Sequence, residues 1–177
     1  MARARARDSQ TSRLPALVMN CIYRTETFVI AVATAVAREK GDTVGRILVV
    51  EDAHVVREPL SRLLKLEGFE VAAAADGNEA MAILESPADA SARPVDLILL
   101  DVMMPRMNGV RFLEALRADA RFRRVAVIAL TGISDTAQLA RLRELGVGAI
   151  VHKVRFRYDD LVDEIRLHLP EESPAPL

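Results

Sequence analysis

Residues 97–109 read LILLDVMMPRMNG. Residues 95–100 read VDLILL, and the aliphatic run from Leu97 is typical of a strand buried on both faces; Asp101 follows it directly. A helical spacing of apolar residues comes next, at Gly109, Phe112, Leu113 and Leu116. This order of buried strand, acidic residue and amphipathic helix predicts one unit of an α/β fold.

The same alternation recurs on both sides of this stretch. Short apolar runs predict strands at residues 47–50, 71–74, 95–100, 125–130 and 148–152. Helical spacing follows each run, and an Ala-, Ser- and Pro-rich loop is expected at 86–94. The sequence therefore predicts a doubly wound parallel sheet with helices on both faces, whose strands end along one edge.

Composition limits the class of protein. The chain has 177 residues, 24 basic and 25 acidic side chains, and a net charge of -1. A nucleic-acid-binding domain would be strongly basic, so no direct nucleic-acid contact is expected. Cys21 is the single cysteine, which excludes an internal disulfide or a multi-cysteine metal cluster and fits the reducing cytoplasm.

The first 43 residues differ from the rest. They carry seven basic and four acidic side chains, a net charge of +3. Charges at Arg24 and Glu26 interrupt their apolar stretches, neither of which reaches the roughly 18 residues of a membrane span. We expect a poorly structured extension and no membrane segment. We hypothesise that translation of the native protein starts at Val44, so that residues 1–43 are absent from it. Detection by mass spectrometry of a peptide from residues 1–38 in the native protein would contradict this hypothesis.

Domain organisation follows from these segments. We expect one folded domain at residues 44–169 and a flexible tail at 170–177. Eight residues are too few to form an output domain. The expectation is therefore a stand-alone domain that acts on a partner protein, through the face formed by the fourth helix, fifth strand and fifth helix.

Five polar residues come at or just after strand ends. They are Glu51, Asp52, Asp101, Thr131 and Lys153. Clustered carboxylates repel one another unless a cation binds, and oxygen ligands favour Mg²⁺. A carboxylate beside such an ion can attack phosphorus and form an acyl phosphate, while an ammonium and a hydroxyl hold the phosphoryl oxygens.

At these residues the sequence resembles the receiver domains of two-component response regulators. The matching stretches are ILVVED at 47–52, ADG at 75–77, LILLDVMMPRMNG at 97–109, ALTG at 129–132, and Lys153. The third stretch is close to a family signature. The resemblance covers residues 45–169 and implies a flavodoxin-like (βα)5 fold with strand order 2-1-3-4-5.

The resemblance also implies a metal site. Asp101 would be the phosphoryl acceptor and would ligate Mg²⁺ together with Asp52. Glu51 would act through a bound water, and the backbone carbonyl of Met103 would be a further ligand. Such a domain is a phosphoacceptor that catalyses its own phosphorylation and dephosphorylation, and is not classed as an enzyme.

Further roles are implied for the phosphoryl group and the switch. Thr131 and Lys153 would bind the phosphoryl group, and Thr131 would move toward it after transfer. Ile150 stands where the family commonly has an aromatic switch residue. The donor would be a phosphohistidine on a sensor histidine kinase or a histidine phosphotransfer protein.

Three departures from the family pattern carry expectations. Val154 replaces the proline that usually follows the lysine, so we expect a trans bond, a less well placed ammonium and slower phosphorylation. Ile150 can repack but cannot bury a hydroxyl. Pro59 is expected to start or kink the first helix.

Three other functions compete with the stand-alone response regulator. A phosphorelay intermediate would pass its phosphoryl group to a histidine phosphotransfer protein. A phosphorylation-independent binding module would use the fold alone, although every charged site residue is present. A haloacid-dehalogenase-like phosphatase needs a second Asp two residues after the nucleophile, where this chain has Met103.

Overall fold

The computed structural model describes residues 45–85, 94–105, 107–132, 136–154 and 157–169. The expected extension at 1–43, the tail at 170–177 and most of the loop at 86–94 lie outside these ranges. Strands and helices alternate throughout. In chain order they are β1 (Arg46–Val50), α1 (His54–Leu66), β2 (Glu70–Ala74), α2 (Gly77–Glu85), β3 (Leu97–Asp101), α3 (Gly109–Ala118), β4 (Ala126–Thr131), α4 (Thr136–Glu144), β5 (Ala149–His152) and α5 (Tyr158–His168).

The five strands form one parallel sheet. Their order is β2-β1-β3-β4-β5, which confirms the predicted fold class. The strand order reverses between β1 and β3, so the ends of these two strands open onto the same crevice. Each predicted strand is present, with bounds that differ from the prediction by at most two residues.

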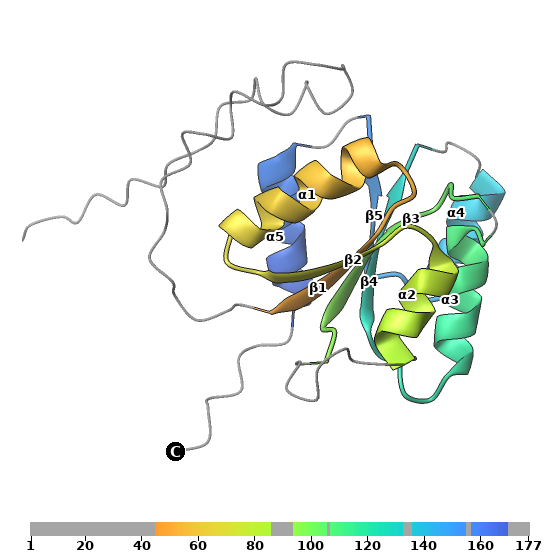
Figure 1. Ribbon diagram of the computed structural model, residues 1–177. Coiled ribbons are helices and arrows are strands. Elements are labelled where there is room, and N and C mark those ends of the chain that lie inside the picture. Colours follow the sequence, from red (N-terminus) through yellow and green to blue (C-terminus); the bar gives the residue numbers. More distant parts are fainter. Residues whose placement is uncertain (1–44, 86–93, 106, 133–135, 155–156, 170–177) are drawn as a thin grey trace, which may run out of the picture.

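Helices cover both faces of the sheet. Figure 1 shows α1 and α5 on one side and α2, α3 and α4 on the other. Alternate residues of β1 and β3 therefore enter different cores. Ile47 and Leu97 pack beneath α1 and α5, whereas Leu48 and Ile98 pack beneath the other three helices. Burial on both faces explains why these strands are apolar without interruption.

Helix α1 excludes one of the two expectations for Pro59, that it starts the helix. The helix begins at His54, and Pro59 lies in its interior, so Pro59 does not start it. Because proline has no N–H, the helix lacks one backbone hydrogen bond at that position. His54 is exposed at the first turn. Among the described residues, no helix is long and apolar enough to cross a membrane.

Candidate functional site

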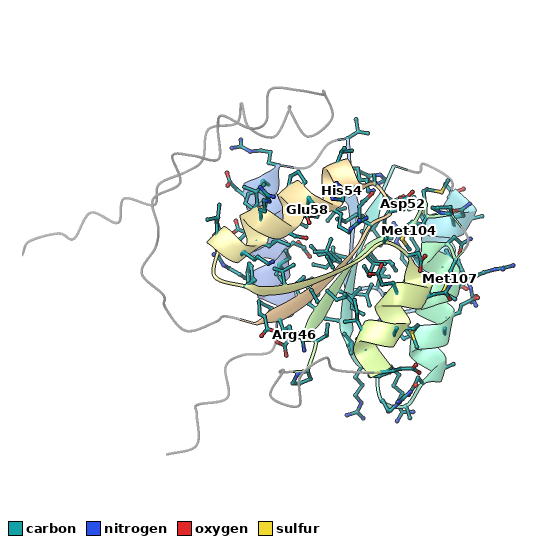
Figure 2. All side chains as sticks on the ribbon, in the orientation of Figure 1. Arg46, Asp52, His54, Glu58, Met104 and Met107 are labelled. Carbon is teal, nitrogen blue, oxygen red and sulfur yellow. The ribbon has the colours of Figure 1, made fainter. Side chains whose placement is uncertain are left out.

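The carboxyl ends of β1 and β3 bring three acidic side chains together. Glu51 and Asp52 follow β1, and Asp101 is the last residue of β3. One carboxylate oxygen from each of the three lies within 4.8 Å of the others. Glu51 is 2% exposed and Asp101 3%, while Asp52 is the most open of the group. In Figure 2, Asp52 and His54 lie at this edge of the sheet and Arg46 lies at the opposite edge.

Lys153 reaches the cluster from the loop after β5. Its Nζ atom lies 2.6 Å from Oε2 of Glu51 and 2.9 Å from Oδ2 of Asp101. The backbone N–H of Lys153 also donates to the carbonyl of Thr131, 2.9 Å away. The Lys153–Val154 bond is trans, as expected, since the described residues contain no cis peptide bond. The ammonium nevertheless contacts both buried carboxylates, so the poor placement expected from Val154 is not found.

Burial and neighbouring charges set the protonation of Glu51 and Lys153. Burial raises the pKa of the Glu51 carboxyl, and Asp101 adds to this effect, although the Lys153 ammonium opposes it. Burial alone would lower the pKa of Lys153, but the two carboxylates outweigh it and raise that pKa. The ammonium therefore stays charged at neutral pH. With three carboxylates and one ammonium, the site favours an added cation.

Asp101 is held from two sides. Its Oδ2 atom contacts Lys153, and its Oδ1 atom accepts a hydrogen bond of 3.0 Å from the backbone N–H of Met103. The chain just after Asp101 is tied to the start of helix α3, because the Gly109 N–H donates to the Val102 carbonyl at 3.0 Å. The Asp101 carboxylate is thus held in one orientation by its protein contacts.

Thr131 and Ile150 occupy neighbouring strands. Thr131 is the fully buried last residue of β4, so it lies at the same sheet edge as Asp101. Ile150 is half-buried in β5, where it pairs in register with Ala129. The structure brings the five strand-end residues to one edge, as predicted. The individual roles of Thr131, Ile150 and the Met103 carbonyl stay predictions.

Arg57 is a site residue that the sequence did not indicate. From the first turns of α1, its Nη1 atom donates to the backbone carbonyl of Glu51 at 2.6 Å and to that of Asp52 at 3.0 Å. The guanidinium thereby fixes the loop that carries both carboxylates. No motif marks such an arginine, because its partners are backbone atoms. The spacing from the acidic pair to the helix is the only sequence signal.

Oxygen ligands in this arrangement fit Mg²⁺. All three side chains offer hard carboxylate oxygens, and the described residues contain no other group of three potential metal ligands of this kind. The acidic triad is therefore consistent with a divalent cation site at the sheet edge.

Comparison with known protein families finds a match over most of the chain. Residues 47–166 match the model of the response regulator receiver domain. The DNA-binding response regulator MtrA of Mycolicibacterium smegmatis is 37% identical over 134 residues, which are 75% of this chain and 54% of that protein. The chain thus spans about half the length of the curated relatives it matches.

Solved structures agree in fold. The chemotaxis protein CheY4 of Vibrio cholerae has a TM-score of 0.62 and 29% identity, covering 71% of this chain and 98% of its own. TrrA of Thermotoga maritima, solved in complex with Mg²⁺ and BeF, has a TM-score of 0.57 and 30% identity, covering 71% and 99%. The acidic pocket is typical of a phosphoacceptor, a signalling module distinct from a classical enzyme. The chain belongs to the response regulator receiver family.

Proposed function

We propose that Asp101 accepts a phosphoryl group from a phosphohistidine in a Mg²⁺-dependent reaction. The observation that carries this proposal is the position of the Asp101 carboxylate. It lies in the acidic triad, 2.9 Å from the Lys153 ammonium and 3.0 Å from the Met103 N–H. A buried carboxylate oriented beside a cation and a metal site is arranged for attack on phosphorus.

The transfer is an in-line displacement. A carboxylate oxygen of Asp101 bonds to phosphorus while the bond between phosphorus and the imidazole nitrogen breaks. The bonding electron pair stays on the imidazole, which takes up one proton. The products are an acyl phosphate on Asp101 and a free histidine on the donor.

Protein groups supply the charge that the transferred group needs. Asp52 and Asp101 would hold Mg²⁺ directly, with Glu51 through water and the Met103 carbonyl as further ligands. When bound, the ion neutralises charge on the phosphoryl oxygens. Lys153 leaves Asp101 for one of these oxygens and stays near the buried Glu51.

Thr131 carries the signal away from the site. Its hydroxyl would bind the phosphoryl group and draw the end of β4 inward, and half-buried Ile150 on β5 would repack in response. The affected surface is the face made by α4, β5 and α5. A local electrostatic change then biases a surface that other proteins read.

A protein donor fits the surroundings of the site. Three exposed apolar side chains follow different strands of the same edge: Val55 at 72%, Met103 at 60% and Val154 at 81%. Such side chains at the mouth of a polar pocket favour contact with another protein. We propose a sensor histidine kinase or a histidine phosphotransfer protein as the cytoplasmic donor, and a protein target for a stand-alone domain.

Phosphorylation by phosphoramidate tests the proposal, because this small donor also carries a bond between phosphorus and nitrogen. Intact-mass spectrometry should show one added phosphoryl group on the wild-type protein with Mg²⁺ and none with EDTA. Asp101→Asn should gain nothing, whereas Asp160→Asn on the exposed side of α5 should behave as wild type. Equal labelling of Asp101→Asn and wild type would refute the proposal.

Transfer assays separate the relay alternative. A relay intermediate returns its phosphoryl group from Asp101 to a histidine phosphotransfer protein. A terminal response regulator loses the group to water instead. The measured quantity is the share of label found on the phosphotransfer protein after mixing.

A further inference from the structure

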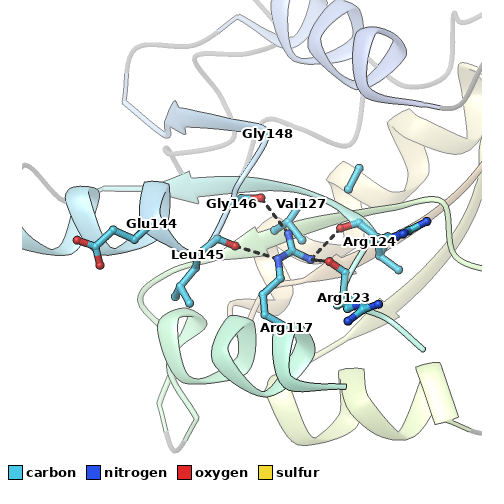
Figure 3. A pocket seen from close by; sticks show the side chains of 10 residues that line it. Arg117, Arg123, Arg124, Val127, Glu144, Leu145, Gly146 and Gly148 are labelled. Atoms are coloured by element: carbon cyan, nitrogen blue, oxygen red, sulfur yellow. Dashed lines mark hydrogen bonds between the residues drawn. The ribbon is translucent and has the colours of Figure 1, made fainter. Parts of the chain in front are cut away.

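A second polar pocket lies at the edge of the sheet opposite Asp101. Its volume is about 470 Å³, and it lies between the last turns of α3 and α4, the first residues of β4 and the loop that precedes β5. Figure 3 shows Arg117 at its centre, with Arg123 and Arg124 at one side. Val125, Val127 and Leu145 supply apolar lining.

The Arg117 guanidinium is fixed by backbone oxygens. It donates to the carbonyls of Leu145 at 2.9 Å, Gly146 at 3.0 Å, Val125 at 3.0 Å and Arg123 at 3.1 Å. These bonds use four of its five N–H groups and hold its plane in the pocket. Among the described residues, its charge is met by carbonyl dipoles alone, and burial lowers the pKa of this group.

The pocket has an excess of positive charge. Within the described parts of the chain, no carboxylate pairs with Arg117, Arg123 or Arg124. Glu144 is the acidic lining residue, and it already contacts Arg141 at 3.1 Å. Three arginines therefore face the pocket against one carboxylate that is shared with another cation.

We propose that this pocket binds an oxyanion, a carboxylate or phosphate group carried on a small organic body. Arginine N–H groups suit the planar or tetrahedral oxygens of such groups. Arg117 offers its one remaining N–H from a fixed position, Arg123 and Arg124 offer the others, and the apolar lining accepts the body of the ligand. Because the strand starts are far from the acidic edge, binding here is independent of Mg²⁺ and of Asp101.

Citrate and inorganic phosphate are suitable probes, with amide NMR signals of Gly146 and Gly148 as the readout. We expect saturable shifts of both signals, and an affinity that falls as NaCl is added. Replacing Arg123 and Arg124 with alanine should weaken binding at least tenfold. The matched variant, Arg62→Ala with Lys65→Ala on the exposed side of α1, should bind as wild type.

A third protein distinguishes the source of the anion. Glu171 and Glu172 follow α5 in the sequence, so the full chain is also titrated as Glu171→Gln with Glu172→Gln. Saturation only in this variant assigns the pocket to the chain's own carboxylates, and equal saturation in both assigns it to a free ligand. The proposal is overturned if neither the wild type nor the glutamine variant binds the probes saturably. It is also overturned if the Arg123 and Arg124 variant binds as tightly as the Arg62 and Lys65 variant.

Discussion

At Gly109, the start of helix α3 lies close to the end of β3. A Cβ atom at this position would lie 2.5 Å from the carbonyl oxygen of Asp101 and 2.8 Å from Cα of Val102. Both are backbone atoms at the end of β3 and cannot rotate away. Glycine is therefore needed here for the close approach that fixes Asp101.

Replacing Gly109 with alanine should destabilise the domain. We expect a loss of about 1–3 kcal/mol in the free energy of unfolding, the usual range for overpacking. Urea denaturation measures it. Gly132→Ala is the control, because nothing lies within 4 Å of a Cβ there, and it should change stability by less than about 0.5 kcal/mol. Equal stabilities of the two variants would contradict the account.

Asp52 provides a test of the metal site that does not involve phosphorylation. Because an ion that binds only the folded state stabilises it, Mg²⁺ at ten times its dissociation constant should add about 1.4 kcal/mol to the free energy of unfolding. Asp52→Asn removes one proposed ligand and should abolish most of this gain. Thermal unfolding with and without Mg²⁺ checks it, and the same gain in both proteins would place the ion elsewhere.

At the scale of elements, α5 contains a buried group that its packing does not satisfy. Tyr158 is the first residue of α5. Its side chain is 4% exposed and lies in the core beneath α1 and α5. Its hydroxyl has no hydrogen-bond partner among the described residues. Burial chiefly, with the charge of Glu67, raises the pKa of this hydroxyl far above its usual range.

This raised pKa predicts a loss of stability in alkali. Above about pH 10 the unfolded chain releases the tyrosine proton while the folded domain retains it, so the free energy of unfolding falls as the pH rises. Between pH 7 and about 11, wild type should lose about 1.4 kcal/mol more than Tyr158→Phe. Urea denaturation at both pH values measures the difference. Parallel losses would show that the hydroxyl titrates normally in the folded protein.

Periodicity predicted the elements most clearly where a strand is buried on both faces, as β1 and β3 are. The uninterrupted apolar runs of β1 and β3 leave no other interpretation, and their bounds are close to those expected. Pro59 shows the limit of local rules. A proline usually ends a helix, yet α1 continues through it, because Leu60, Leu63 and Leu64 gain burial against the sheet.

For the whole molecule, the sequence predicted which residues meet but not how they are held. Glu51, Asp101 and Lys153 could be placed together because a parallel sheet ends all its strands at one edge. The hydrogen bonds from Arg57 and Arg117 could not be predicted. Each arginine donates to backbone carbonyls that lie near it only in the folded chain. The nearness of Lys153 despite Val154 likewise depends on three-dimensional geometry.

The central claim is that Asp101 itself receives the phosphoryl group. The most direct measurement is to treat the protein with acetyl phosphate and Mg²⁺, reduce the product with borohydride, and sequence its peptides by mass spectrometry. Borohydride converts an aspartyl phosphate into homoserine, which marks the modified position permanently. The account predicts homoserine at position 101 alone, and only when both acetyl phosphate and Mg²⁺ were present. Homoserine at another aspartate, or at none, would contradict it.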